Sequence, residues 1–574
     1  MRRKNRFPVR RTLAVAAWVT LASTPAQAQY APPSAPVPVP VQAAPYTAQP
    51  APTPATPYVA APSRPTYQTQ SETLSAALRS ARARDREGAL AYRASLTDPV
   101  ARKIVDWALV DVFGEQLGLP EIQRANRELV GWPRAAGREA ALTRFSGPAT
   151  PTGPVPYSTL QASTLEPGES RVFTDMRLRM NEALKAGDVA AAYSAVANHG
   201  LRAGGSEYAE AESFAGWLAL NKLRNPSLAL GHFTRLDANV RSPVSKARAA
   251  YWLGRTAEAM GDQARARNHY IAGAQHSTTF YGLLAAERTG APQLVIMRDP
   301  VPTDAERAAF NNSEVMRAMR LLSQAGEKSL VRVFGLHLGD TVETPVELAV
   351  LMDSIKAMGE QELSMLAYRR GAQRGIILHE RGYPVRSLPS VAGAPEPALV
   401  LAITRQESQF DPRVRSSADA RGMMQLLPGT ARDTARKIGV GYDEGQLWEA
   451  EYNMRLGSAY LGEVADRFSG SYIMAAAGYN AGPGRPGQWA AFCGDPRSPS
   501  TDPLDYIECI PFNETRNYVM RVMENMQVYR ARLGGGQAPI TLSRDLKRGG
   551  YGSSVASGQP TPYQPSAGYR SNGG

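Results

Sequence analysis

Apolar residues recur at helical spacing over most of the chain between residues 69 and 383. The segments that show this spacing most clearly are Ser71–Ala91, Ser206–Leu223, Val244–Met260 and Ser313–Gln324. An apolar residue at every third or fourth position predicts amphipathic helices that bury one face. Runs of alternating β-branched residues, which would predict strands, are nearly absent. The pattern therefore predicts a mainly α-helical fold with few strands.

A repeat of 37 residues runs through this helical region. Small residues occupy one position of the repeat, larger apolar residues lie four positions further on, and turn signals recur in step. These three sets are Ala192, Ala229 and Ala266; Val196, Phe233 and Tyr270; and Gly187-Asp188, Asn225-Pro226 and Gly261-Asp262. Such a repeat is typical of stacked helical hairpins that bury a continuous core. We expect an α-superhelix of TPR-like hairpins over 69–383, with chance phasing of ordinary helices as the alternative.

The first residues of the chain have the three parts of a secretory signal peptide. Six basic residues among the first eleven precede the apolar run Leu13–Leu21, and the small-residue site Ala26-Gln27-Ala28 follows. The run is shorter than the ~20 apolar residues that a membrane span needs. The sequence predicts a signal peptide over 1–28, export to the periplasm and no stable membrane insertion.

Two further segments have compositions that cannot bury a core. Residues 30–65 contain 12 prolines in 36 positions, which predicts a disordered Pro-rich linker over 29–68. Residues 534–574 contain 10 glycines in 41 positions, which predicts a disordered Gly-rich tail.

Composition and charge argue against nucleic-acid binding and against a metal or cofactor site. The 574 residues include 65 Lys and Arg against 52 Asp and Glu, a net charge of +13, but six of the basic residues lie in the signal peptide. Between residues 66 and 533, 54 basic residues nearly balance 51 acidic ones, so no nucleic-acid partner is expected. With two cysteines and no phosphate-binding, HExxH or ordered GxSxG motif, no metal and no cofactor are expected.

Glu407 is the strongest candidate for a catalytic acid. Pro397 suits the first turn of a helix, and the apolar stretch Ala398–Ser408 then runs to the Asp411-Pro412 break. The negative end of the helix dipole and apolar neighbours both disfavour a carboxylate, and this favours a proton donor near neutral pH. A solvated glutamate at a helix end has the same local pattern, so this argument alone leaves both interpretations open.

Four motifs in a fixed order decide between them. They are ES at 407–408, GMMQLLPGT at 422–430, YNAG at 479–482 and IPFNETRNYV at 510–519. The set resembles the soluble lytic murein transglycosylases, and YWLGR at 251–255 and FYGLLA at 280–285 resemble the helical region of that family. The resemblance implies an α-helical superhelix or solenoid followed by a lysozyme-like α (α+β) catalytic domain over 384–533.

The resemblance also implies an activity. Its members cleave the β-1,4 bond between N-acetylmuramic acid and N-acetylglucosamine of peptidoglycan and form 1,6-anhydromuramic acid ends without adding water. One carboxyl transfers both protons, and by position this is Glu407. Two alternatives remain: a lysozyme- or chitinase-like hydrolase, in which Asp411 or Asp419 would activate water, and a non-catalytic envelope scaffold that binds proteins through the solenoid or the Pro-rich linker.

Further site residues follow from the same positions. The substrate-binding candidates are Ser416, Gln425, Tyr479 and Glu514, and the supporting candidates are Ser408, Met424, Asn480 and Arg516. Tyr479 is expected to hydrogen-bond the acid or the N-acetyl group, Asn480 to hold its loop together, and Arg516 to neighbour Glu514 in charge. Asp419 stands where the family usually has glycine, and aspartate tolerates a left-handed turn.

Cys493 and Cys509 both lie in the predicted catalytic domain. In an exported protein two cysteines this close in sequence are expected to form a disulfide, with two free buried thiols as the alternative.

Overall fold

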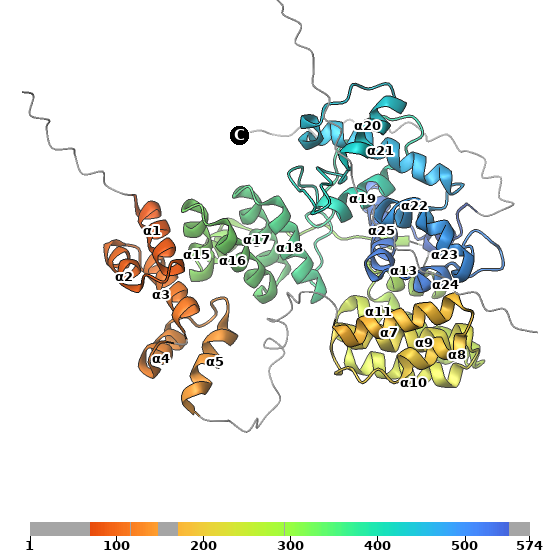
Figure 1. Ribbon diagram of the computed structural model, residues 1–574, viewed down its shortest axis with the longest axis horizontal. Coiled ribbons are helices and arrows are strands. Elements are labelled where there is room, and N and C mark those ends of the chain that lie inside the picture. The colour runs from red at the N-terminus through yellow and green to blue at the C-terminus, as the bar shows by residue number, and fades with distance from the viewer. Residues whose placement is uncertain (1–68, 115, 147–169, 292, 550–574) are drawn as a thin grey trace, which may run out of the picture. The chain divides into compact units, whose positions relative to one another are not determined.

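A computed structural model describes residues 69–114, 116–146, 170–291 and 293–549. The predicted signal peptide, the whole of the predicted Pro-rich linker and residues 550–574 lie outside the described residues. Figure 1 shows a mainly helical fold in which a small antiparallel sheet pairs β1 (Gln293–Val295) with β2 (Gln537–Pro539). The predicted fold class is thus confirmed.

The helices before the predicted catalytic domain are α1 (Gln70–Arg82), α2 (Arg86–Ser95), α3 (Pro99–Phe113), α4 (Leu119–Glu128), α5 (Ala135–Ser146), α7 (Arg171–Lys185), α8 (Val189–Ala197), α9 (Ser206–Trp217) with a π-helical turn at Leu218–Lys222, α10 (Pro226–Asn239), α11 (Pro243–Ala259), α12 (Gln263–Ala274), α13 (Phe280–Arg288), α14 (Asp304–Asn311), α15 (Glu314–Gln324), α16 (Lys328–Thr341), α17 (Pro345–Ala357) and α18 (Gln361–Gln373).

The helices of the predicted catalytic domain and the segment after it are α19 (Pro397–Ser408), α20 (Pro428–Lys437), a 3₁₀ turn at Gly445–Trp448, α21 (Ala450–Arg467), α22 (Tyr472–Ala481), α23 (Arg485–Cys493), α24 (Pro503–Cys509), α25 (Asn513–Leu533) and α26 (Leu542–Leu546).

The 37-residue repeat corresponds to the second helices of stacked hairpins. Asp188, Asn225 and Asp262 are the N-caps of α8, α10 and α12, and each side chain accepts a hydrogen bond from the backbone amide three residues on. The six small and large apolar positions of the repeat are buried. The repeat therefore sets both the start of each helix and the face that it buries.

Glycines on the first helix of two hairpins make room for aromatic rings on the second. A Cβ atom added at Gly216 of α9 would lie 2.5 Å from the ring of Phe233, and one added at Gly254 of α11 would lie 2.4 Å from the ring of Tyr270. Since real Cβ atoms do not approach this closely, the two glycines let each helix pair pack against its ring.

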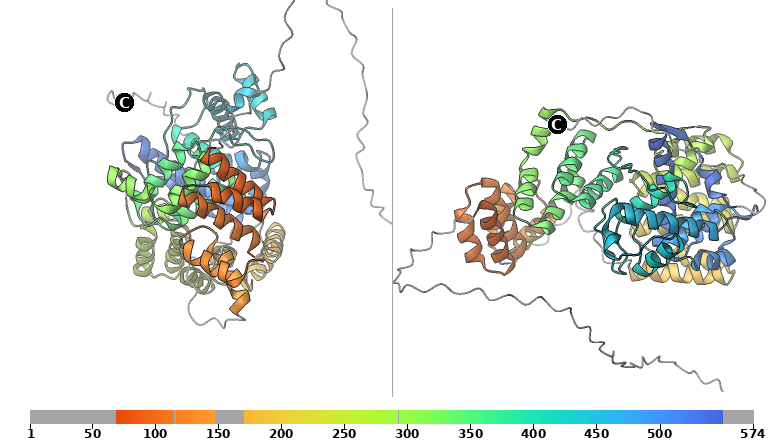
Figure 2. Two further views of the ribbon diagram at one scale, coloured as in Figure 1. Left: turned by 90° about the vertical axis from the view of Figure 1, so that its left-hand side faces the viewer. Right: turned by 90° about the horizontal axis from the view of Figure 1, so that it is seen from above.

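The helical region does not stack in simple chain order. Figures 1 and 2 show α1 to α3 beside α15 and α16, which lie more than 200 residues later in the sequence. Ion pairs join the two groups: Arg82 with Glu327 at 2.7 Å, and Lys103 with Glu314 at 2.8 Å. Trp132 Nε1 also donates a hydrogen bond to Glu314, at 2.9 Å. The chain thus returns to its first helices before it enters the catalytic segment.

One predicted helical segment is divided in the structure. The stretch Ser71–Ala91 reads as continuous in sequence, but α1 ends at Arg82 and α2 begins at Arg86. Arg84 adopts a left-handed conformation with φ 60°, and the Asp85 side chain accepts a hydrogen bond from the amide of Gly88. A local cap at Asp85 therefore ends one helix and starts the next within one apolar pattern.

The prediction of a disordered tail from residue 534 is wrong over 537–546. β2 pairs with β1, and α26 buries Leu542 and Leu546 completely or nearly so. Asp545 accepts hydrogen bonds from Gln527 and Arg530 of α25. A Gly-rich composition misleads here because a few apolar and charged residues find tertiary partners.

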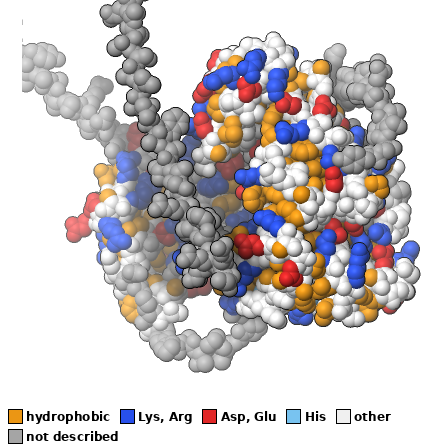
Figure 3. All heavy atoms as spheres, turned by 45° about the vertical axis from the view of Figure 1, so that its right-hand side comes forward, with side chains coloured by type: hydrophobic (Ala, Val, Ile, Leu, Met, Phe, Trp, Pro, Cys, Tyr) orange, Lys and Arg blue, Asp and Glu red, His pale blue; other side chains and the backbone are white. Residues whose placement is uncertain are grey.

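The face shown in Figure 3 carries basic and acidic side chains interspersed with one another. In the part of the chain that the structure describes, no helix is both long enough and apolar enough to cross a membrane.

We predict that Gly254→Ala destabilises the protein, by about 1–3 kcal/mol, because the new methyl group overpacks against Tyr270. Gly231→Ala in α10 is the matched control, since its nearest neighbour would be the Arg235 guanidinium at 3.5 Å. We expect this control to be neutral or to stabilise by up to about 1 kcal/mol. Calorimetric unfolding of the full chain checks both, and equal effects of the two variants would contradict the packing argument.

Candidate active site

Helix α19 carries Glu407 on its last turn. The helix starts at Pro397 and buries Leu399 and Ile403, and it ends where Gln409 takes a left-handed conformation with φ 54°. The Ser408 hydroxyl donates a hydrogen bond to the Met423 carbonyl at 2.6 Å. The apolar helix therefore delivers the carboxyl to the end of a packed core, and Ser408 ties that end to the loop of the second motif.

Tyr518 of α25 is the hydrogen-bond partner of Glu407. Its hydroxyl donates to Glu407 Oε1 at 2.6 Å. Burial raises the pKa of Glu407 from 4.5 to about 7, the Tyr518 hydrogen bond opposes this shift, and the negative charge of Glu514 adds to it. The raised pKa favours the protonated form of Glu407 near neutral pH, as a proton donor requires.

Glu514 and Tyr518 lie on the same face of α25. They are four residues apart, which is close to one helical turn. Glu514 is exposed, whereas Tyr518 is buried. One helix thus presents a hydrogen-bond donor to the Glu407 carboxyl and, one turn earlier, a solvated carboxylate.

Tyr479 does not make the predicted hydrogen bond to the acid, and the alternative, a hydrogen bond to the N-acetyl group, stays a prediction. Its pKa is raised by burial and by the nearby charge of Glu407, so it lies near the acid. Its hydroxyl, however, donates to the Met424 carbonyl at 2.8 Å and not to Glu407. Sequence reasoning missed Tyr518 in the partner role, although a tyrosine one turn after Glu514 was the available signal.

Hydrogen bonds within the loop at 414–426 engage Ser416 and Gln425. Gln425 Nε2 donates to the carbonyls of Val414 at 2.8 Å and Gly422 at 2.9 Å, and its own φ is 50°. Ser416 Oγ accepts from the Ala420 amide at 3.0 Å. Asp419 has φ 66°, the left-handed turn expected where the family usually has glycine. These side chains shape the loop that follows the acid.

Asn453 of α21 holds the same loop through hydrogen bonds of its side-chain amide to the backbone. Its Oδ1 accepts from the Met424 amide at 2.8 Å, and its Nδ2 donates to the carbonyls of Arg421 and Leu447, both at 2.9 Å. Met424 is fully buried, and a Cβ atom at Gly457 would collide with its side chain. Sequence reasoning did not single out Asn453, because this residue lies outside the four motifs.

Asn480 and Thr515 connect the third motif to the fourth. Thr515 Oγ1 donates to Asn480 Oδ1 at 2.7 Å, so α22 is joined to the first turn of α25. This hydrogen bond is consistent with the supporting role expected for Asn480.

The expected pairing of Arg516 with Glu514 does not occur. Arg516 is fully buried and bonds to Glu210 of α9 and to Asn513, and it lies 4.3 Å over the ring of Phe214. Residues 514 and 516 project from different faces of α25, since two positions turn a helix by about 200°. Arg516 therefore fixes α25 to the helical region.

A second buried ion pair joins the same two regions. Arg248 of α11 donates to Glu508 of α24 at 2.6 Å and to Glu210 at 3.1 Å, and the Tyr281 hydroxyl also donates to Glu508. Removing one partner of a buried pair leaves an uncompensated charge. These contacts make the position of α25, and so of Tyr518, depend on the upstream helices.

The disulfide Cys493–Cys509 joins the ends of α23 and α24, with the Cα atoms 5.6 Å apart. Close to it, Trp489 of α23 packs edge-on against Phe512 with ring centroids 5.5 Å apart, and Arg485 lies 4.7 Å over the same ring. Phe512 is 42% exposed. The result is an apolar, partly exposed surface directly before Glu514.

The two aspartates considered as a second catalytic carboxyl are already engaged. Asp411 accepts from the backbone and side chain of Arg413. Asp419 pairs with Arg415 at 2.6 Å and Arg421 at 2.9 Å, and hydrogen bonds from these two residues lower its pKa to about 2. Within the described residues, no group of three or more His, Cys, Asp or Glu side chains could hold a metal ion.

Comparisons with known proteins agree with this geometry. Residues 390–495 match the Transglycosylase SLT domain, and residues 509–538 match the Soluble lytic transglycosylase helical domain. The resemblance to soluble lytic murein transglycosylases is confirmed.

Two curated relatives carry the name soluble lytic murein transglycosylase. The protein of Salmonella typhimurium is 29% identical over 291 residues, 47% of this chain and 41% of its own length. The protein of Escherichia coli K12 is 39% identical over 139 residues, 24% of this chain and 21% of its own length. The matched part thus spans about two fifths or less of these relatives.

A solved structure shows the same fold. It is an inactive mutant of the lytic transglycosylase Slt from Pseudomonas aeruginosa, 22% identical, with a TM-score of 0.50 over 82% of this chain and 74% of that chain.

We predict that two substitutions move the pKa of Glu407 in opposite directions. Tyr518→Phe removes the hydrogen bond that stabilises the carboxylate, so the pKa rises above 7. Glu514→Gln removes a repelling negative charge, so the pKa falls below 7. Carboxyl ¹³C NMR titration of Glu407 measures both values, and shifts of the same sign would contradict the assignment.

We predict that Glu407→Gln stabilises the protein at high pH. The folded pKa of about 7 exceeds the ordinary 4.5, so the free energy of unfolding of the wild type falls as pH rises from about 4.5 through 7. The variant has no carboxyl at this position and so does not lose this stability. Above pH 7 its free energy of unfolding should exceed that of the wild type by about 3 kcal/mol. Unfolding midpoints of both proteins at pH 4.5 and pH 8 check this. The same difference between variant and wild type at the two pH values would refute the prediction.

Proposed function

We propose that this chain is a peptidoglycan lytic transglycosylase that cleaves the β-1,4 bond between N-acetylmuramic acid and N-acetylglucosamine and leaves 1,6-anhydromuramic acid ends. The observation that carries the proposal is the Glu407 carboxyl, which is half-buried, accepts a hydrogen bond from Tyr518 and has its pKa raised to about 7. The Transglycosylase SLT domain match contains this residue.

Glu407 acts first as an acid and then as a base. The protonated carboxyl donates its proton to the glycosidic oxygen, and the bond from C1 to that oxygen breaks. The muramyl 6-hydroxyl oxygen then bonds to C1, and its proton returns to the Glu407 carboxylate. The substrate's own N-acetyl group stabilises the positive charge at C1 between the two steps. No water is consumed, and the enzyme ends in its starting protonation state.

A pKa near 7 suits one group that performs both transfers. A carboxyl with the ordinary pKa of 4.5 would be almost wholly ionised at neutral pH, and one with a far higher pKa would be a poor acid. Tyr518 limits the upward shift by hydrogen-bonding the carboxylate. Because Asp411 and Asp419 are bonded to arginines, neither has the environment of a base that activates water.

The remaining site residues divide into two roles. Glu514, exposed one turn before Tyr518, and the exposed ring of Phe512 contact the sugar chain. Ser416, Gln425 and Tyr479 bind substrate as parts of the loop wall that their internal hydrogen bonds hold in place. Ser408, Met424 and Asn480 support this wall.

The proposal includes the domains of the protein and its location in the periplasm. Residues 384–533 form the catalytic domain, and the helices over 69–383 form the superhelical domain that guides glycan strands to it. The signal peptide over 1–28 directs the protein to the periplasm, where peptidoglycan lies. Peptidoglycan glycan strands are the partner.

We predict that Glu407→Gln abolishes release of anhydromuropeptides from purified sacculi, with a loss of at least a thousandfold, because glutamine neither donates nor accepts the proton. Mass spectrometry distinguishes the reactions, since an anhydro end is lighter than a reducing end by the mass of one water.

Glu463→Gln is the matched control, because Glu463 is an exposed glutamate of α21 paired with Lys437. We expect it to keep wild-type activity. Products with reducing muramic acid ends alone would establish a water-using hydrolase, with Glu514, whose charge raises the pKa of Glu407, as a candidate second carboxyl. Absence of any cleavage by the wild type would favour the scaffold alternative.

A further inference from the structure

Two hydrogen bonds hold the peptide group between Met423 and Met424 from opposite sides. Its carbonyl oxygen, on Met423, accepts from the Ser408 hydroxyl at 2.6 Å. Its amide, on Met424, donates to Asn453 Oδ1 at 2.8 Å. A peptide group is planar and trans, so its carbonyl and its amide point in opposite directions, and a bond at each end fixes its orientation. The residue after Glu407 is thus joined to α21 through one peptide group.

The Ser408 end of this connection determines how α19 stops. Besides donating to Met423, the Ser408 hydroxyl accepts from the Phe410 amide at 3.1 Å. Gln409 and Phe410 both have left-handed conformations, with φ 54° and 65°. Such backbone is uncommon for residues other than glycine, so this turn depends on its hydrogen bonds. A displaced Met423 carbonyl would therefore loosen the turn that directly follows Glu407.

At the other end, the Asn453 side chain bonds to the backbone with all of its polar groups. Besides the Met424 amide on Oδ1, its Nδ2 donates to the carbonyls of Arg421 and Leu447, both at 2.9 Å. Asn453 is fully buried. Only a side-chain amide offers an acceptor together with two N–H donors. An alanine at this position would deprive three backbone groups of their partner, and an aspartate would turn a carboxylate oxygen toward two carbonyl oxygens.

Two further residues of α21 lie on the same face as Asn453. Gly457 and Tyr460 follow it by four and seven positions, which is about one and two helical turns. A Cβ atom at Gly457 would lie 2.4 Å from Met424 Sδ, and the Tyr460 ring packs against the ring of Tyr479 with centroids 5.4 Å apart. Tyr479 in turn donates to the Met424 carbonyl. One face of α21 therefore supports the loop backbone, Met424 and Tyr479 together.

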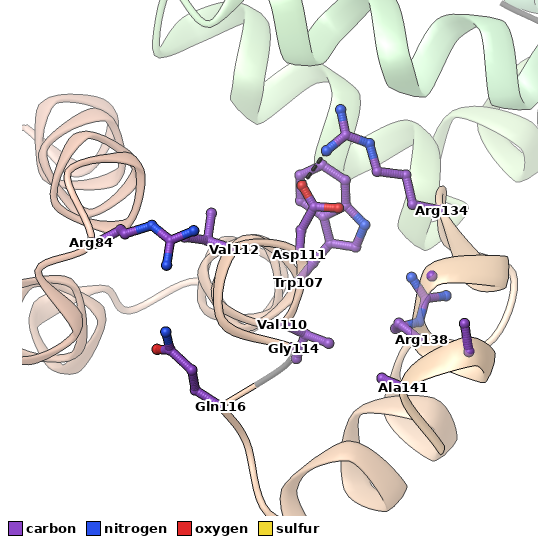
Figure 4. A pocket seen from close by; sticks show the side chains of 12 residues that line it. Arg84, Trp107, Val110, Asp111, Val112, Gly114, Gln116, Arg134, Arg138 and Ala141 are labelled. Carbon is purple, nitrogen blue, oxygen red and sulfur yellow. Dashed lines mark hydrogen bonds and ion pairs between the residues drawn. The ribbon is translucent and has the colours of Figure 1, made fainter. Parts of the chain in front are cut away.

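A buried polar side chain of the helical region shows the contrast with a purely local role. Arg138 of α5 is 5% exposed and lines a cavity of about 480 Å³ beside α3 (Figure 4). Its guanidinium donates to the carbonyls of Leu129, Trp132 and Pro133, all within nine residues of it in sequence. Asn453 instead joins α21 to backbone groups 29 and 32 residues away.

We propose that Asn453 is a positioning residue for the Glu407 acid: by orienting the peptide group between Met423 and Met424, it holds the Ser408 hydroxyl and the end of α19 in place. Because Asn453 is fully buried, it acts through the backbone and not by contact with substrate. The expected effect on the rate of cleavage rests on the proposed function, whereas the connection itself does not.

The first test measures the rate of cleavage of purified sacculi per folded molecule of the full chain. We expect Asn453→Ala to lower this rate about hundredfold, since a misplacement of about 1 Å is enough for such a loss. Ser408→Ala, which breaks the connection at its other end, should lower the rate about tenfold, because the Asn453 bonds remain. The double variant should lose no more than Asn453→Ala alone, because both bonds act through one peptide group. A loss equal to the product of the two single effects would contradict the connection.

Arg138→Met is the matched control, because it also removes a buried side chain that bonds to three backbone groups. We expect this control to lower the free energy of unfolding and to leave the rate per folded molecule unchanged. Equal losses of rate in Arg138→Met and Asn453→Ala would reduce Asn453 to a structural role and overturn the proposal.

Asn453→Asp keeps the acceptor for the Met424 amide and tests the two donor bonds. The protonated acid can donate to one of the two carbonyls, whereas the carboxylate repels both, so the pKa of the new carboxyl is raised in the folded protein. Its rate relative to the wild type and its free energy of unfolding should therefore be highest near pH 5 and fall toward pH 8. This variant also serves if Asn453→Ala does not fold. A relative rate that is independent of pH would contradict the role of the donor bonds.

Hydrogen exchange of the Met424 amide tests the connection without reference to activity. We expect both Asn453→Ala and Ser408→Ala to speed this exchange while the full chain stays folded, and Arg138→Met to leave it unchanged. Unchanged exchange in Ser408→Ala would show that the two bonds are independent and would overturn the proposal. If the wild type cleaves no peptidoglycan, the proposed function fails, but the exchange result still decides whether Asn453 and Ser408 are connected.

Discussion

The burial of one carboxyl between two helices is the constraint on which the site depends. Glu407 lies half-buried at the end of α19, and Tyr518 of α25 is its hydrogen-bond partner. Burial alone would make the carboxyl too weak an acid, and full solvation would leave it ionised. The Tyr518 hydrogen bond keeps the pKa of the carboxyl between these limits, so this pKa depends on the relative position of α19 and α25.

That position is secured from outside the catalytic segment. Arg516 of α25 is buried against Glu210 and Phe214 of α9, and Arg248 of α11 bonds to Glu508. Charges buried at such a depth persist only with their partners in place. The buried charges of the helical region therefore help to fix the helix that carries Tyr518.

Most of the helices could be predicted from the sequence, and so could the motifs that make up the candidate active site. The N-caps at Asp188, Asn225 and Asp262, the start of α19 at Pro397 and the left-handed turn at Asp419 all follow from local residue chemistry. The two failed predictions have different causes, one local and one tertiary. Asp85 caps a new helix inside one apolar pattern, and residues 537–546 are ordered by partners that lie more than 200 residues away, such as β1.

By itself the sequence determined the helices and the order of the motifs, and it singled out Glu407 as the candidate acid, because these depend on local residue patterns and on motifs read along the chain. Only the tertiary structure decided which tyrosine bonds to Glu407 and which acid pairs with Arg516. Hydrogen bonds and ion pairs of this kind join residues more than a hundred positions apart. Their partners are chosen by packing, and no local pattern records that choice.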